Sequence, residues 1–380
     1  MNAQYIDIHV LQTVPYANLN RDDLGSPKTV RFGYVDRTRV SSQCWKRAVR
    51  EELEWSCGNA AKRTRRLLHA VQERLIDQGW DQELAAFAAS QVMAALSAIA
   101  VKDDGFKLDK KTGEAQVLFF LPERAFDELA GICVQQRDRL TGLQSGAIKL
   151  KKGETALPVD AIRTVMSLRN EVINLFGRML AELPKTNVDG AVQVAHAFTT
   201  HGTDPQVDFF TAVDDLKKDA EEAGSGHMDS AEYSTGTFYR YASVNLRDLV
   251  KNAGDVTTAI ELAAEFLSTF ITAMPRAKKN STAPFTVPEL VYIAVRGDRP
   301  VSLASAFEAP VRATLDGGYA EPSRRQLADY AGRIYRLLGN HGLIYHGQAS
   351  IDDKGLEQLG EVQPSFDSLV TAAINAARTE

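Results

Sequence analysis

The sequence has few of the residues that build disulfide scaffolds or thiolate metal sites. It contains three cysteines in 380 residues, Cys44, Cys57 and Cys133, and no CxxC pair. An odd number of widely spaced cysteines argues against a disulfide framework and against a zinc site. The thiols are interpreted as ordinary side chains in a reducing compartment, which predicts a cytoplasmic protein.

The signatures of common enzyme classes are also missing. No P-loop, no GxSxG, no HExxH and no GxGxxG after a strand occurs. The N-terminus has neither the basic nor the apolar region of a signal peptide. The longest uncharged run, Leu84 to Val101, is largely Ala with three polar residues, which favours a buried helix over a membrane span. We predict no catalytic residue, no metal, no cofactor and no membrane partner.

Positive charge is in deficit over the chain as a whole. Lys and Arg total 44 against 49 Asp and Glu, a net charge of −5. This balance argues against unspecific nucleic-acid binding by the whole surface but permits a local basic groove.

Hydrophobic periodicity indicates an α+β protein. The segment Tyr5–Val14 alternates with period two, as a half-buried strand does, whereas 18–39 is interpreted as a loop. The expected order of strand, helix, helical insertion, strand, loop, strand, helix and strand is βαββαβ, a modified ferredoxin-like or RNA-recognition-motif arrangement. The other expected strands are 116–121, 188–200, 236–246 and 285–295, and the expected helices are 41–55, 59–79, 81–101, 123–140, 158–183, 257–274, 301–314, 323–339 and 365–378.

The strongest local feature is a basic region over residues 21–50. It holds eight Lys and Arg against three Asp. On the predicted helix after Ser41 and Ser42, four side chains share one face at i, i+3, i+4 and i+7: Gln43, Lys46, Arg47 and Arg50. Such a row beside a capped helix start suits phosphate oxygens. A solvated charged face explains the same pattern equally well.

Two further segments carry candidate residues. Gly177, inside Leu175–Met179, costs a helix about 1 kcal/mol relative to Ala and suggests a close backbone approach, with Arg178 and Met179 beside it. The stretch 196–227 is rich in His and Asp, but His196 and His201 are five residues apart, a spacing that fits neither a helical ligand pair nor one strand face. A metal- or His-dependent nuclease is therefore the less favoured alternative.

Several segments together resemble the CasC family, the guide-RNA backbone subunit of the type I-E CRISPR Cascade complex. They include Leu19–Asp23, Arg39–Gln43 with Lys46–Ala48, Leu175–Met179, Ala195–His201, Asp208–Leu216 and Thr235–Ala242. The resemblance is dense over 5–50 and 175–250 and thin elsewhere.

The resemblance implies a hand-shaped, non-catalytic subunit for antiviral defence. Its palm would comprise 1–57, 186–200 and 233–300, its helical finger insertion 58–185 and its thumb loop 201–232, while 301–380 would be mostly helical and pack on the palm. Copies would stack head to tail along CRISPR RNA, join other Cascade subunits and present the guide to target DNA. Each thumb would displace a guide base at regular intervals.

The resemblance also implies which residues contact the guide. Its backbone would be held by Arg21, Ser41, Ser42, Gln43, Lys46, Arg47 and Arg50, with Arg178 and Met179 beside a displaced base. Such contacts must not depend on sequence, because base pairing does the reading. A nuclease using His196 or His201, or a protein-only adaptor with a large helical surface, would be the alternatives.

Overall fold

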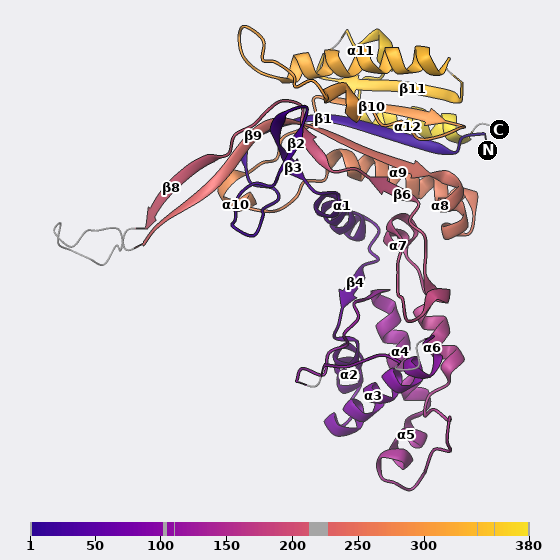
Figure 1. Cartoon of the computed structure of the whole chain (residues 1–380). Coiled ribbons are helices and arrows are strands. Elements are labelled where there is room, and N and C mark those ends of the chain that lie inside the picture. The colour runs from indigo at the N-terminus through magenta and orange to yellow at the C-terminus, as the bar shows by residue number, and fades with distance from the viewer. Residues whose placement is uncertain are drawn as a thin grey trace, which may run out of the picture. The chain divides into compact units, whose positions relative to one another are not determined.

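The computed structural model describes residues 2–101, 105–109, 111–212, 227–339, 341–352 and 354–378. The chain divides into two compact units: unit 1 is Met1–Leu53 with Val192–Glu380, and unit 2 is Glu54–Ala191 (Figure 1). The described residues form both helices and strands, and unit 1 contains one large mixed sheet, which confirms the prediction of an α+β protein.

Unit 1 holds ten strands among its described residues. They are β1 (Tyr5–Ala17), β2 (Thr29–Phe32), β3 (Val35–Val40), β6 (Val192–Val194), β7 (Ala197–Thr199), β8 (Gln206–Ala212), β9 (His227–Asn245), β10 (Leu290–Arg296), β11 (Leu343–Ser350) and β12 (Glu361–Val362). Its helices are α1 (Ser42–Ser56), which runs on into unit 2, α8 (Leu246–Ala253), α9 (Val256–Thr272), α10 (Lys279–Thr282), α11 (Ala320–Leu338) and α12 (Phe366–Arg378), with 3₁₀ turns at Ala304–Phe307 and Glu357–Leu359.

The sheet of unit 1 is ordered β12-β11-β10-β1-β9-β7-β3-β2, and β6 and β8 also pair with β9. Strand β1 lies at the centre, where Ile8 is opposite Ala242 of β9 and Ile293 of β10. The prediction of a half-buried strand is wrong, because the polar residues Asp7 and His9 on its other face are buried as well. Every pairing is antiparallel except that of β11 with β12.

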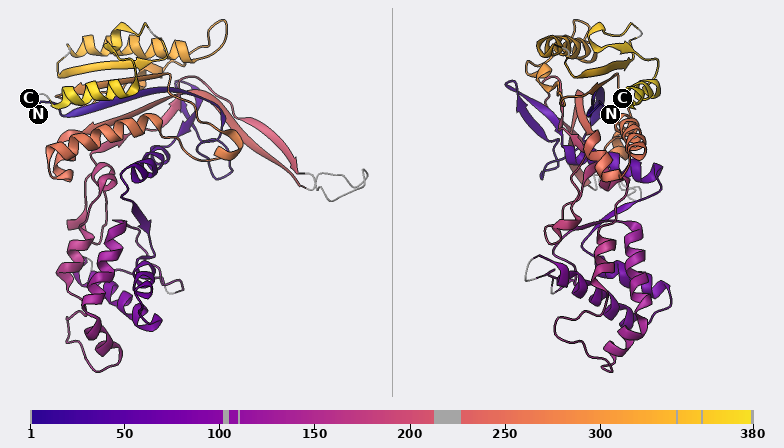
Figure 2. Two further views of the ribbon diagram at one scale, coloured as in Figure 1. Left: turned by 180° about the vertical axis from the view of Figure 1, so that it is seen from behind. Right: turned by 90° about the vertical axis from the view of Figure 1, so that its right-hand side faces the viewer.

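Helices cover both faces of this sheet (Figure 2). On one face, Tyr239 and Tyr292 pack in a buried cluster with Phe307 and with Leu327 and Tyr335 of α11. The opposite face carries α1, α9 and α12, with α12 contacting both α9 and β10. This two-sided cover explains why β10 is buried along its whole length.

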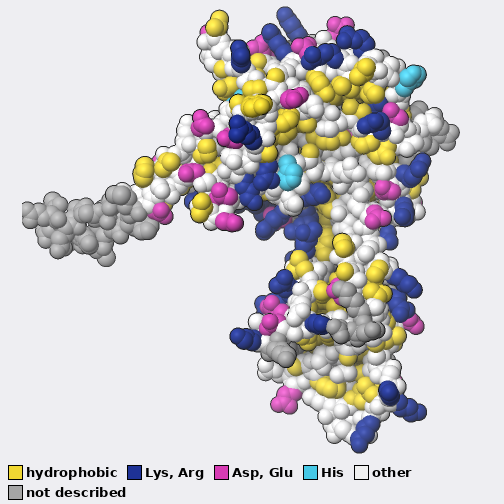
Figure 3. Space-filling view, viewed as in Figure 1, with side chains coloured by type: hydrophobic (Ala, Val, Ile, Leu, Met, Phe, Trp, Pro, Cys, Tyr) yellow, Lys and Arg dark blue, Asp and Glu magenta, His cyan; other side chains and the backbone are white. Residues whose placement is uncertain are grey.

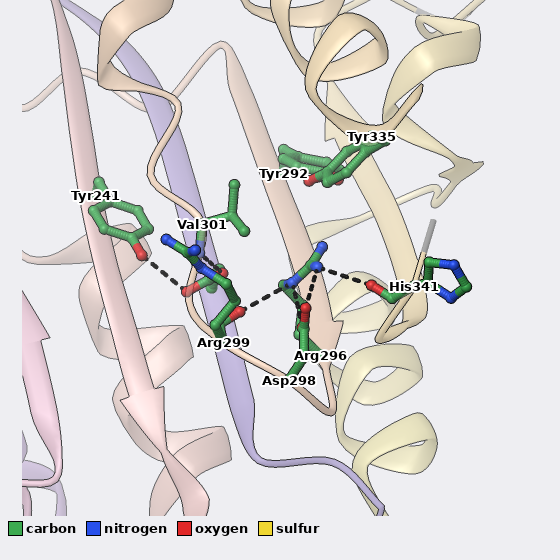
Figure 4. Close-up of polar contacts among 9 residues, drawn as sticks. Tyr241, Tyr292, Arg296, Asp298, Arg299, Val301, Tyr335 and His341 are labelled. Atoms are coloured by element: carbon green, nitrogen blue, oxygen red, sulfur yellow. Dashed lines mark hydrogen bonds and ion pairs between the residues drawn. The ribbon is translucent and has the colours of Figure 1, made fainter. Parts of the chain in front are cut away.

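Two charged side chains, Asp7 and Arg296, are buried on the α11 side of the sheet, and Figure 4 shows Arg296 with the residues that it contacts. Arg296 has a fully buried side chain and donates to Asp298 at 3.0 Å and to the backbone oxygens of Arg299 and His341. Asp7 accepts from the Tyr241 hydroxyl at 3.0 Å and from Val301 N–H at 2.8 Å. Burial raises the pKa of Asp7 to about 6, because desolvation outweighs these hydrogen bonds.

The raised pKa of Asp7 predicts a pH-dependent stability that Asp7→Asn should remove. The folded protein holds the Asp7 proton more tightly than the unfolded chain, so this stabilisation is present below the ordinary pKa of 3.8 and is lost as pH rises through about 6. Between pH 4.5 and 7 the wild type should lose about 2 kcal/mol relative to Asp7→Asn. Urea denaturation of both proteins at the two pH values measures this change. The same difference in unfolding free energy between wild type and Asp7→Asn at both pH values would contradict the prediction.

Unit 2 is a helical unit with one two-stranded sheet. It contains β4 (Ala61–Thr64), α2 (Leu67–Asp77), α3 (Gln82–Ile99), β5 (Phe119–Pro122), α4 (Glu123–Gln135), α5 (Arg137–Gln144), α6 (Val159–Met166), α7 (Glu171–Phe176) and a 3₁₀ turn at Pro184–Thr186. Helix α3 begins at a cap where Asp81 accepts from two N–H groups, and its apolar residues are buried in the core of the unit. No helix among the described residues could span a membrane.

Three predicted helices are wrong in whole or in part. Over 158–183, Asn170 caps a separate short helix, with Oδ1 3.2 Å from Ile173 N, and Gly177 ends it at φ 77°. Residues 61–64 of the helix predicted at 59–79 form β4 instead. The segment 301–314 is irregular beyond its 3₁₀ turn, because Val311 N–H bonds to Thr200 O.

Two predicted loops contain hairpins. Within 18–39, β2 and β3 are joined by a two-residue turn at Gly33 and Tyr34, both with positive φ. Within 201–232, β8 pairs with β9 from Gln206–Tyr233 to Ala212–His227, while 213–226 lies outside the described residues. The C-terminal part predicted as mostly helical also contains β11 and β12. Polar or short strands of this kind give weak periodicity.

Candidate nucleic-acid interface

The start of α1 is fixed by the loop that precedes the β2–β3 hairpin. Ser41 caps the helix, as predicted, because its Oγ accepts from Cys44 N at 3.3 Å. The Ser41 N–H in turn donates to Asn20 Oδ1 at 2.9 Å, and the Cys44 thiol lies 3.5 Å from Leu19 O. These contacts place exposed Arg21, the next residue in the loop, close to the first turn of α1.

The predicted basic face of α1 is accessible. Gln43 and Arg47 are exposed, and Lys46 and Arg50 are half-buried. Arg47 pairs with Glu51 at 2.8 Å, so part of its charge is offset within the helix. In Figure 3, Lys and Arg side chains gather over β2, β3 and the start of α1. Of the sequence-predicted residues of unit 1, Ser41 is buried, whereas the others are exposed or half-buried on α1 and in the loop before the β2–β3 hairpin.

The opposite face of α1 docks on the sheet through a buried cation. Trp45 is 1% exposed, and the guanidinium carbon of Arg240 lies 3.9 Å from the centre of its ring. Arg240 also stacks 4.8 Å from the ring of Phe270 in α9 and donates to Gln12 Oε1 at 2.6 Å and to the backbone oxygen of Phe270. Full burial lowers the pKa of Arg240 to about 9. The position of α1 thus depends on this stack.

His196 also lies beside the start of α1, a position that its place in the sequence did not indicate. It lies between β6 and β7, and its Nδ1 is 3.1 Å from Ser42 N and 3.3 Å from Arg39 Nη1. Partial burial and the neighbouring Arg39 lower the pKa of His196. The contact joins residues more than 150 positions apart, so no local spacing could have predicted it.

The remaining predicted pair, Arg178 and Met179, lies in unit 2. Arg178 is 6% exposed, and its guanidinium donates to Thr186 O at 2.7 and 3.1 Å and to Leu168 O at 2.8 Å. Desolvation lowers its pKa to about 10. These contacts assign Arg178 to holding the turn, and its contact with a base stays a prediction. Met179 is 81% exposed.

A cavity of about 590 Å³ lies beside Met179. Its lining includes Phe120, with the guanidinium carbon of Arg63 4.7 Å from the ring centre. Gly177 and Gly190 supply bare backbone to the same wall, because a Cβ on Gly177 would lie 2.7 Å from Gly190 N. An aromatic ring, a cation and exposed backbone are features that can receive a flat polar group.

The histidines considered for catalysis do not form a reactive cluster. Nδ1–H of His201 donates to Gly202 O at 2.9 Å, and its Nε2 accepts from Thr237 N at 3.2 Å. The ring stacks on Tyr319 at 3.5 Å, so both nitrogens and one face are committed to structure. Within the described residues, no group of three or more His, Cys, Asp or Glu could hold a metal ion.

The β8–β9 hairpin extends away from the rest of unit 1 (Figure 1). It exposes Val207, Phe209 and Phe210, with relative exposures of 43–73%. The predicted thumb, 201–232, contains nine acidic residues. The structure describes Asp204, Asp208, Asp229 and Glu232, whereas Asp214, Asp215, Asp219, Glu221 and Glu222 lie outside the described residues. Apolar side chains on an uncovered two-stranded ribbon are typical of a contact surface.

The chain is similar to known proteins over nearly its full length. The family model described as CT1975-like protein matches residues 6–372. One solved chain, titled "CRISPR RNA-guided surveillance complex, pre-nicking", is 49% identical with a TM-score of 0.90, covering 98% of this chain and all of the other. A second, titled "CRISPR RNA-guided surveillance complex", is 43% identical with a TM-score of 0.79, covering 98% of this chain and 99% of the other. No curated protein sequence matches the chain.

Proposed function

Because the chain belongs to the family of CT1975-like proteins, we propose that it is a CRISPR-RNA-binding backbone subunit of an RNA-guided surveillance complex. The resemblance predicted from its motifs is thereby confirmed. The observation that carries the proposal is the 49% identity, over the whole length of the other chain, with a chain of such a complex. The proposed role is structural, without catalysis, in antiviral defence.

The sheet of unit 1 supports a modified RNA-recognition palm. Its four central strands lie in the order β10-β1-β9-β7. Along the chain, α1 lies between β1 and β7, and α9 lies between β9 and β10. Trp45 of α1 and Phe270 of α9 stack on the same side chain, Arg240, so both helices cover one face. This order supports the proposed ferredoxin-like βαββαβ palm.

Within this palm, we propose that α1 and the loop before the β2–β3 hairpin hold the guide backbone. The residues are Arg21, Ser41, Ser42, Gln43, Lys46, Arg47 and Arg50. Ser41 caps α1 and so fixes its first turn, and the Lys, Arg, Ser and Gln side chains of this set are types that bind phosphate oxygens. Phosphate contacts position a strand without reading its sequence, as a subunit serving every guide requires.

The other proposed contacts are made by Met179 in unit 2 and by the β8–β9 hairpin. Met179 would lie beside a displaced guide base, with Arg178 holding its turn. The exposed Phe209 and Phe210 of the β8–β9 hairpin would pack on the next copy in a head-to-tail filament. Other subunits would complete the complex, and the guide would pair with target DNA.

The basic face of α1 gives a quantitative prediction. Lys46→Ala with Arg50→Ala should weaken binding of all guide sequences alike and lower the slope of log affinity against log salt by up to about 2, because two phosphate contacts are lost. Fluorescence anisotropy with two unrelated guides at several salt concentrations measures both effects. The matched control, Arg333→Ala with Arg336→Ala on α11, removes equal charge from the other face of the sheet. A loss that depends on guide sequence would contradict the prediction.

The decisive experiment is co-expression with partner subunits and a repeat–spacer array, followed by sequencing of the RNA that copurifies. Uniform RNA of guide length and array sequence would support the backbone role. An assembly that survives RNase and carries no nucleic acid would favour a protein-only adaptor. Guide RNA that stays unprocessed only when His196 and His201 are both replaced would favour the nuclease.

A further inference from the structure

The hydrogen bonds of His196 fix which ring nitrogen carries the proton. A backbone N–H can only donate, and Ser42 N lies 3.1 Å from Nδ1. A guanidinium can also only donate, and Arg39 Nη1 lies 3.3 Å from the same atom. Nδ1 is therefore an acceptor, and the neutral ring has its proton on Nε2. The side chain is exposed, so this N–H is available on the surface that carries the basic face of α1.

We propose that the Nε2–H group of His196 donates a hydrogen bond to a backbone oxygen of the guide RNA, either a phosphate or a 2′-hydroxyl oxygen. This inference rests on the proposed function and adds one contact residue to it. Ser42, which occupies Nδ1, is itself among the residues proposed to hold the guide. An oxygen bound by the first turn of α1 would therefore lie beside the imidazole.

The contact differs in kind from those of Lys46 and Arg50. Because partial burial and Arg39 lower the pKa of His196 from its ordinary value, the ring is neutral at pH 7 and offers a donor without a charge. Removing a neutral donor releases no additional counterion from the RNA. Loss of His196 should therefore weaken binding without changing the salt slope, whereas loss of Lys46 and Arg50 changes both.

A purely positioning role is the competing explanation. His196 could serve only as the acceptor that holds the Ser42 N–H, and its outer nitrogen would then contact nothing. Two amide replacements separate the roles, because the Asn oxygen can take the place of Nδ1 and the Gln NH₂ can take the place of Nε2. His196→Asn keeps the inner acceptor and loses the outer donor, and His196→Gln does the reverse.

The test measures affinity of the full chain for guide-length RNA by anisotropy at several salt concentrations. We expect His196→Asn to bind about fivefold more weakly, the effect of one hydrogen bond of about 1 kcal/mol, with an unchanged salt slope. We expect His196→Gln to bind within about twofold of wild type. Normal binding by Asn with weak binding by Gln would assign a positioning role and overturn the proposal.

Two further arms complete the design. A 2′-deoxy strand of the same sequence identifies the acceptor: the effect of His196→Asn vanishes on it for a 2′-hydroxyl and persists for a phosphate. The Lys46→Ala, Arg50→Ala variant tests the proposed function separately. Full affinity in both His196 variants with loss in the Lys46, Arg50 variant would overturn only the histidine contact. Full affinity in all three would overturn the proposed interface.

Discussion

Replacing Arg240 with alanine should lower the free energy of unfolding by about 3–5 kcal/mol, because a cavity in the core and an unsatisfied buried acceptor both cost stability. The side chain is 1% exposed and lies between the rings of Trp45 and Phe270. Its loss would open a cavity between α1, α9 and the sheet and leave Gln12 Oε1 without its 2.6 Å donor. Urea denaturation followed by tryptophan fluorescence measures the change.

Arg240→Met provides the matched control for this prediction. Methionine fills a similar volume and keeps the contact with both rings, and apolar replacements of buried charges are often neutral. We expect Arg240→Met to lose less than half of what Arg240→Ala loses. If the two variants unfold alike within error, packing of the side chain contributes nothing beyond its charge. A loss below about 1 kcal/mol for Arg240→Ala would contradict the assigned role of the stack.

The same variants connect stability with RNA binding. Trp45 is the buried anchor of α1, and the basic residues lie on the exposed side of that helix. If the Arg240 stack sets the position of α1, Arg240→Ala should also weaken guide binding at temperatures where the protein is still folded. The salt slope should stay near the wild-type value, because no phosphate contact is removed.

Much of the palm could be predicted from the sequence because its elements carry strong local patterns. Apolar residues alternate in the sequence of β1, and Ser41 precedes an amphipathic helix. Helix α9 has a long apolar stripe, and each of its ends lies within two residues of the predicted end. The β8–β9 hairpin could not be predicted in this way. A two-stranded ribbon that buries little has no periodic face, and its acidic sequence is typical of a loop.

The candidate interface was predictable to a similar degree. Helical spacing alone places Gln43, Lys46, Arg47 and Arg50 on one face. It does not reveal that Arg178 bonds the carbonyls of Leu168 and Thr186, because a buried Arg and an exposed one look alike in sequence. Contacts between distant segments, such as His196 with Ser42, become visible only when the sheet brings β6 and β7 beside α1.

Gly177→Ala should destabilise unit 2 by about 3 kcal/mol, because backbone strain and a backbone overlap add at this position. Gly177 adopts φ 77° and ψ 173°, a region open essentially only to glycine. A Cβ would also lie 2.6 Å from Val188 O and 2.7 Å from Gly190 N, and neither atom belongs to a side chain that could rotate away. Hydrogen exchange of unit 2 amides measures the loss.

Gly146 supplies a control with a positive φ and no overlap. It has the same φ of 77° in the same unit, but a Cβ there meets nothing within 4 Å. Gly146→Ala should therefore cost only the positive-φ penalty, about 1 kcal/mol. The difference between the variants contains the strain of the φ 77°, ψ 173° region and the cost of the overlap with the backbone of Val188 and Gly190, where Val188 exchanges two 2.8 Å hydrogen bonds with Arg178. Equal losses would mean that the close approach of 177 to 190 is not what fixes the turn presenting Met179.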